Sequence, residues 1–113
     1  MHELSLAESV LQIIEETAVT KGFRQVRSVV LEIGQLATIE ADAMRFCFDA
    51  VVRGSVAEGA LLEIVEVPGC GWCAQCAETV PMSDLLSCCP NCGFHRLQLK
   101  GGQEMRLKSL EVE

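Results

Sequence analysis

Four cysteines in two closely spaced pairs constrain the fold of this chain more than any other feature of its sequence. Two residues separate Cys73 from Cys76 and Cys89 from Cys92, and twelve residues separate the pairs. A pair of this spacing lets one tight turn present two sulfurs to one ion, and two such turns complete the tetrahedral ligand set that zinc prefers. The spacing therefore predicts a structural zinc site on these four cysteines.

Other side chains near these pairs offer alternative ligands. Cys70 forms a third pair of the same spacing with Cys73, Cys88 directly precedes the second pair, and His95 follows it. We interpret Cys70 and Cys88 as bystanders, because using them would make the spacings unequal or disrupt the turn at Pro90. We interpret His95 as a solvated loop residue, with replacement of one thiolate as its alternative role.

Composition and charge narrow the class of protein. The 113 residues suffice for one domain with a small satellite module, and 50% of them are hydrophobic, so a core can form. A net charge of −7 disfavours nucleic acid as a partner, since that binding needs Lys and Arg to neutralise phosphates. No apolar run approaches the ~20 residues that cross a bilayer and no secretion signal is visible, so we expect a cytoplasmic protein without a membrane partner. In that reducing compartment cysteine pairs indicate metal ligands or redox centres rather than disulfides.

Helical periodicity predicts a first helix directly behind His2 and Glu3. Ser5 and Glu8 have the spacing of a capping box, which would begin the helix, and Gly22 would end it. One face of this helix is apolar and comprises Leu6, Val10, Ile13, Ile14 and Ala18.

A second helix and three strands complete the predicted elements. The second helix begins near position 40, ends before Gly54 and contains Cys47 as a small core residue. We assign its apolar face to Ala43, Phe46, Ala50 and Val51. Runs of β-branched or alternating apolar residues predict strands at 26–34, 60–67 and 104–113.

The order of these elements predicts an α/β (α+β) fold. Two helices pack on a small three-stranded mixed sheet, and a loop-rich zinc-binding module is inserted before the last strand. We expect residues 1–68 and 102–113 to form the α/β domain and residues 69–101 to form the zinc-binding module.

The first residues of the chain offer a second set of metal ligands. The amine of Met1, the backbone amide nitrogen of His2 and the imidazole of His2 can close two fused chelate rings around one ion. Ni(II) and Cu(II) favour such nitrogen-rich, planar arrangements, to which Glu3 can add a backbone nitrogen or a carboxylate. A histidine in second position is also common as a frayed terminal residue, so these residues alone leave both interpretations open.

Three segments of the sequence resemble one known family. They are the opening MHELSLAESV, the central LEIGQLATIEADAMRFCFDAVVRGSVAEGA and the spacing of the four cysteines, in this order. Together they are similar to the HypA/HybF hydrogenase maturation proteins over essentially the whole chain. The resemblance implies a nickel metallochaperone and not an enzyme, with nickel as cargo for the large subunit of nickel-iron hydrogenase.

The resemblance also implies site residues and partners. In this family the nickel site is built around three N-terminal residues, here Met1, His2 and Glu3, which makes residues 1–68 and 102–113 the nickel-binding domain. In some members an acid before the second helix joins or supports this site. Glu40 stands at the matching position, where the family pattern has Asp, and a helix N-terminal acid favoured by the dipole is its alternative role. The implied partners are a HypB-type GTPase, the hydrogenase large subunit and, for some members, urease maturation proteins.

Two other classes of protein explain part of the sequence. A zinc-ribbon protein-interaction module without nickel delivery would account for the cysteines but not for the N-terminus. A CxxC thiol oxidoreductase would account for the pairs, but it needs an exposed thiolate of low pKa in a βαβ setting. Metal content and nickel binding of untagged protein distinguish the three classes.

Overall fold

Two compact units make up the chain in the computed structural model, which describes residues 2–113. The first unit comprises the chain up to Leu31, Ile39–Ile64 and Leu107–Glu113, and the second comprises Glu32–Thr38 and Val65–Arg106. The division into a nickel-binding domain and a zinc-binding module at the boundaries given above stays a prediction.

Helix α1 (His2–Lys21) buries a stripe of small and branched residues that recur at intervals of three and four positions. Its buried residues are Ala7, Val10, Ile14 and Ala18. The helix ends before Gly22, as predicted, but the predicted start at Ser5 is wrong. Ser5 lies inside the helix, where its carbonyl oxygen accepts a hydrogen bond from the Ser9 hydroxyl (3.0 Å). An acid in the first turn, Glu3, suits the positive end of the helix dipole.

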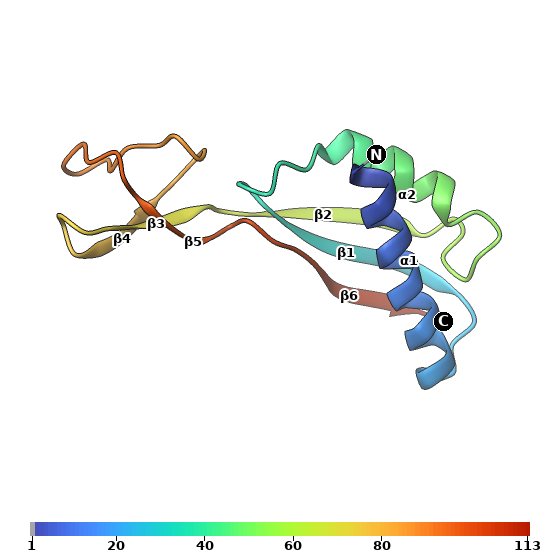
Figure 1. Ribbon diagram of the computed structural model, residues 1–113. Helices are drawn as coiled ribbons and strands as arrows, with labels where there is room; N and C mark the ends of the chain where they lie inside the picture. Colours follow the sequence, from blue (N-terminus) through green and yellow to red (C-terminus); the bar gives the residue numbers. More distant parts are fainter. Residues whose placement is uncertain (1) are drawn as a thin grey trace. The chain divides into compact units, whose positions relative to one another are not determined.

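Helix α2 (Ala41–Val51) packs against α1 in the first unit (Figure 1). It buries Met44, Cys47 and Phe48, so the prediction that Cys47 is a core residue is confirmed. The predicted apolar face is wrong, because the side chain of Phe46 is 72% exposed. Within residues 2–113 neither helix is long and apolar enough to cross a membrane.

Three strands form the predicted mixed sheet. They are β1 (Val26–Gly34), β2 (Leu61–Val67) and β6 (Met105–Val112), in the order β2-β1-β6. The central strand β1 carries the most buried side chains of the three, and the predicted inward positions Val29, Leu31 and Ile33 are all buried. The predicted fold class, two helices with a small three-stranded sheet and a separate cysteine module, is confirmed.

Backbone hydrogen bonds at the strand ends give the directions of the three strands. Gly34 donates to the carbonyl of Glu104 (2.8 Å), and Glu113 donates to the carbonyl of Gln25 (3.0 Å). The end of β1 therefore lies at the start of β6, and these two strands are antiparallel. Gln35, which follows β1, donates to the last carbonyl of β2 (2.8 Å), which places the carboxyl ends of β1 and β2 together, as in a parallel pair.

A second, antiparallel sheet organises the cysteine segment in the second unit. It consists of β3 (Cys70–Cys73), β4 (Glu78–Pro81) and β5 (Gln98–Gly101), in the order β4-β3-β5. We predicted a loop-rich module, and this prediction missed the three strands, each of which has four residues.

Candidate metal centres

Four cysteine sulfurs lie together in the second unit. The Sγ atoms of Cys73, Cys76, Cys89 and Cys92 are all within 4.8 Å of one another. The distance is 3.6 Å between the sulfurs of Cys73 and Cys92 and 3.9 Å between those of Cys76 and Cys89. Four sulfurs at about 2.3 Å from one zinc ion in a tetrahedron are about 3.8 Å apart. The cluster therefore has the size of a tetrahedral four-thiolate metal site.

The first cysteine pair lies in the turn that joins β3 to β4. Cys73 is the last residue of β3, and its sulfur accepts the backbone N–H of Cys76 (3.4 Å). Ala77 then adopts a positive φ of 54°, and β4 begins at Glu78. The antiparallel register of the two strands fixes this turn, because Cys73 pairs directly with Glu78.

The second cysteine pair lies in a turn that is closed by its own backbone. The N–H of Cys89 donates to the carbonyl of Phe94, and the N–H of Gly93 donates to the carbonyl of Cys89, both at 2.8 Å. Gly93 has a φ of 77°, which fits the tight turn predicted after this pair. Backbone N–H groups of Asn91 and Cys92 point at the sulfur of Cys89.

Burial and hydrogen bonding set the protonation of these thiols. Burial raises the pKa of the Cys89 thiol, but hydrogen bonds from the N–H groups of Asn91 and Cys92 and from the thiols of Cys92 and Cys73 together lower this pKa to about 7. The pKa of Cys76 is raised, first by its hydrogen bond with the neighbouring thiol of Cys92 and then by burial. Four thiolates this close repel one another, so a bound divalent cation stabilises the fully deprotonated set.

The remaining cysteines and His95 lie outside this cluster. Cys70 is half-buried in β3, Cys88 is exposed and Cys47 is buried in α2. The imidazole of His95 is exposed and tilted against the ring of Phe94, with the ring centroids 6.2 Å apart. In the described part of the chain, no other group of three or more His, Cys, Asp and Glu side chains is arranged to hold a metal ion.

At the start of α1, His2 and Glu3 lie side by side. Nδ1 of His2 is 3.7 Å from Oε2 of Glu3, and the imidazole is about half exposed. The same carboxylate oxygen accepts the backbone N–H of Glu40 (3.3 Å). This hydrogen bond is the main reason why the pKa of the Glu3 carboxyl is lowered. The third predicted ligand residue, Met1, lies outside the described residues.

Glu40 approaches Glu3 with its main chain. It is the N-cap residue of α2, with φ −80° and ψ 116°, and its side chain does not cap the helix. Its carboxylate is exposed. The structure thus brings the backbone of Glu40 to Glu3, while a direct metal contact of the Glu40 carboxylate stays a prediction.

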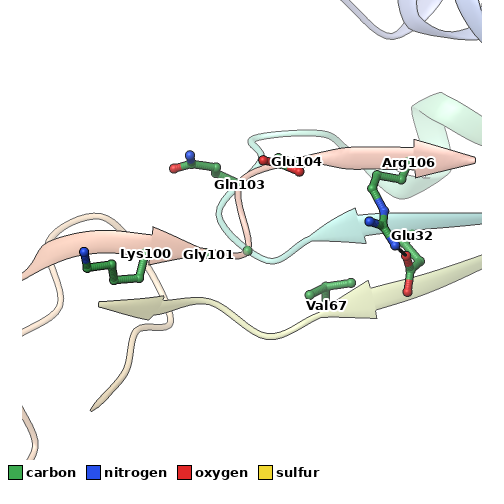
Figure 2. Close-up of a pocket in the computed structure, with 8 residues that line it drawn as sticks. Glu32, Val67, Lys100, Gly101, Gln103, Glu104 and Arg106 are labelled. Carbon is green, nitrogen blue, oxygen red and sulfur yellow. Dashed lines mark hydrogen bonds and ion pairs between the residues drawn. The ribbon is translucent and has the colours of Figure 1, made fainter. Parts of the chain in front are cut away.

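A polar cavity of about 360 Å³ opens in the second unit and contains none of the predicted site residues. Figure 2 shows Arg106 reaching towards Glu32, and the two form an ion pair of 2.9 Å. The lining residues are Glu32, Val67, Lys100, Gly101, Gly102, Gln103, Glu104 and Arg106. They come from three separate segments without a shared motif, so no local sequence pattern predicts this cavity.

Comparison with known proteins places the chain in a family. The family described as "Hydrogenase/urease nickel incorporation, metallochaperone, hypA" matches residues 1–112. The hydrogenase maturation factor HypA of Dechloromonas aromatica is 58% identical over 113 residues, and that of Albidiferax ferrireducens is 59% identical over 113 residues. In both comparisons the match covers 100% of each chain.

Solved structures agree with this placement. The solution structure of the nickel metallochaperone HypA from Helicobacter pylori is similar with a TM-score of 0.71 and 26% identity, over 97% of this chain and 96% of that one. A second solution structure of a HypA protein has a TM-score of 0.74 and 28% identity, over 100% of this chain and 97% of that one. The chain therefore belongs to the HypA family of hydrogenase maturation factors and nickel-incorporation metallochaperones.

Proposed function

We propose that this protein is a nickel metallochaperone without catalytic activity, which binds Ni(II) at its N-terminus and helps insert it into the large subunit of nickel-iron hydrogenase. Membership of a nickel-incorporation family supports the cargo and the process. The observation that carries the N-terminal site is the placement of the Glu3 carboxylate 3.7 Å from Nδ1 of His2.

The proposed nickel ligands come from consecutive residues. The amine of Met1, the backbone amide nitrogen of His2 and the imidazole of His2 form two fused chelate rings, and Glu3 supplies a carboxylate or a backbone nitrogen. The amide N–H of His2 has no acceptor within its helix, because the first N–H groups of a helix have none. Donor atoms about 2.1 Å from one ion are at most about 4.2 Å apart, so His2 and Glu3 can share an ion with little rearrangement. Glu40 supports this site.

For the cysteine cluster we propose a structural zinc ion. Four thiolates leave no open position for a substrate, which is typical of structural zinc sites and not of catalytic ones. Two of the four sulfurs are almost completely buried, those of Cys73 and Cys89, and they pack with Val80, Phe94 and Leu97. Zinc binding would then supply much of the folding free energy of residues 69–101.

The proposed partners follow from the family. Its description names both hydrogenase and urease nickel incorporation, which supports the hydrogenase large subunit and urease maturation proteins as partners. A HypB-type GTPase is proposed from the resemblance to the family alone. The net charge of −7 disfavours nucleic acid. We place the protein in the cytoplasm, where seven cysteines remain reduced for metal binding.

Nickel titration of untagged, zinc-loaded protein tests the N-terminal site. Calorimetry should show that His2→Ala abolishes specific nickel binding and that one extra residue before Met1 is nearly as damaging, since it converts the amine into an amide. Zinc content and thermal unfolding should stay unchanged, because the His2 side chain is about half exposed. Unchanged nickel affinity in both variants would refute the site and favour a zinc-ribbon module without nickel delivery.

A further inference from the structure

One oxygen of Glu3 links the His2 imidazole to the start of α2. The backbone N–H of Glu40 donates to Oε2 of Glu3 at 3.3 Å, although the two residues are 37 positions apart. The same oxygen is 3.7 Å from Nδ1 of His2. The carboxylate of Glu3 is therefore held at the imidazole by a main-chain donor from a different element.

The Glu40 amide is available because the first turn of α2 does not use it. In a capping box, an acid or amide side chain three residues after the N-cap accepts the N–H of the N-cap residue. The residue at that position of α2 is Ala43, which has no side-chain acceptor. Glu3 of α1 takes over this role, while the carbonyl of Glu40 starts the helix by accepting the N–H of Met44 (2.9 Å).

We propose that Glu40 is a positioning residue that acts through its backbone N–H, holding the Glu3 carboxylate beside His2, and that its own carboxylate is dispensable. This inference rests on the nickel site proposed above and deepens it. A free glutamate side chain samples many rotamers, and one hydrogen bond to a fixed amide selects those that keep Oε2 at the imidazole. Losses of partners that orient metal ligands typically lower metal affinity by about 10- to 100-fold.

Proline at position 40 removes the backbone donor and also favours an extended conformation at Ile39. The φ of Glu40, −80°, lies within the range that proline imposes. Glu40→Pro should weaken nickel binding roughly 10-fold or more. Glu40→Gln keeps the N–H and removes the charge. Nickel affinity should therefore change by less than about twofold, which is smaller than the change expected when an orienting partner is lost.

Ala41→Pro is the matched control. It places proline at the first position of the same helix, where proline is well tolerated, and the ψ of 116° at Glu40 suits a residue before proline. The Glu40 N–H remains, so nickel affinity should equal that of the wild type. All variants are titrated as untagged, zinc-loaded protein, with zinc content and thermal unfolding measured alongside.

The outcomes separate this inference from the proposed function. Equal losses of nickel affinity in Glu40→Gln and Glu40→Pro would show that the carboxylate is the important group, and this would overturn the inference. Wild-type nickel affinity in Glu40→Pro would overturn it as well. If His2→Ala abolishes nickel binding while Glu40→Pro does not, only the inference fails; if His2→Ala has no effect, the nickel site itself fails. Should Glu40→Pro not fold, the amide resonance of Glu40 decides: Glu3→Ala should shift it upfield, and an unchanged resonance would overturn the contact.

Discussion

Phe46 and Phe48 are two positions apart on α2, and their side chains have opposite environments. Phe48 is 2% exposed and is among the largest fully buried side chains, whereas Phe46 is 72% exposed. Two residues correspond to about 200° of rotation on an α-helix, so the two rings lie on opposite faces. Of these two rings, only that of Phe48 belongs to the core of the first unit.

Truncation of each ring should reveal this difference. Phe48→Ala removes a buried aromatic side chain and should lower the free energy of unfolding by about 3–5 kcal/mol. Phe46→Ala changes a surface position and should alter it by no more than about 0.5 kcal/mol. Denaturant titration of the zinc-loaded protein measures both, and equal losses would contradict the orientation of α2.

The sequence predicted both helices, most of the buried face of α1 and the start of α2, but not the buried face of α2 or the first turn of α1. The sequence of α2 did contain a signal for its orientation. Its charged residues Asp42, Arg45 and Asp49 recur at intervals of three and four positions on one face, and the buried face with Met44, Cys47 and Phe48 lies away from them. The predicted face included Phe46, which borders this charged stripe. The start of α1 was missed for another reason, because Glu3 in its first turn has its partner 37 residues away at Glu40, beyond the reach of any local pattern.

Each cysteine of the cluster should be required for zinc. Replacement of any one by serine removes a thiolate, and the module should release zinc and unfold, since metal binding supplies folding free energy to small modules. Zinc content and amide NMR dispersion measure the effect in single variants of Cys73, Cys76, Cys89 and Cys92.

Two surplus cysteines provide the controls for this experiment. Cys70 and Cys88 lie outside the cluster, so Cys70→Ser and Cys88→Ser should retain a full equivalent of zinc. A zinc-free Cys70→Ser protein together with a zinc-loaded Cys76→Ser protein would show that the ligand set is a different one.

Local spacing predicted which cysteines meet, because each pair sits within a single turn and the backbone of that turn presents both sulfurs. The strands around them gave no such signal. β3 has only four residues and includes two cysteines and a glycine, and its register depends on distant partners: Cys70 pairs with Pro81 on one side and Gly101 on the other. Such short strands have too little periodicity to be distinguished from loop.

Close backbone packing in the second unit makes Gly34 sensitive to substitution. A Cβ at this position would collide with the carbonyl of Gly102. This carbonyl belongs to the main chain, so it cannot move away as the end of a flexible side chain could. Gly34→Ala should therefore lower the free energy of unfolding by at least about 2 kcal/mol. Gly59→Ala is the control, because it meets no atom within 4 Å and carries only the strain of a φ of 78°, which costs about 1–2 kcal/mol. Denaturant titration compares them, and a smaller loss in Gly34→Ala than in Gly59→Ala would contradict the close approach.

Ala77 and Gly93 occupy equivalent positions, each directly after the second cysteine of a pair, and both have positive φ values of 54° and 77°. Glycine adopts this conformation without strain, whereas a residue with a Cβ pays about 1–2 kcal/mol. The side chain of Ala77 is exposed, so its methyl group contributes little packing.

Ala77→Gly should therefore raise the stability of the zinc-loaded module by up to about 1 kcal/mol, after the larger backbone entropy of glycine in the unfolded chain is subtracted. Gly93→Ala should lower it by about 1–2 kcal/mol, because it introduces the same strain at the second turn. Thermal unfolding and competition for zinc with a chelator measure both variants, and weaker zinc binding in Ala77→Gly would show that the two turns are not equivalent.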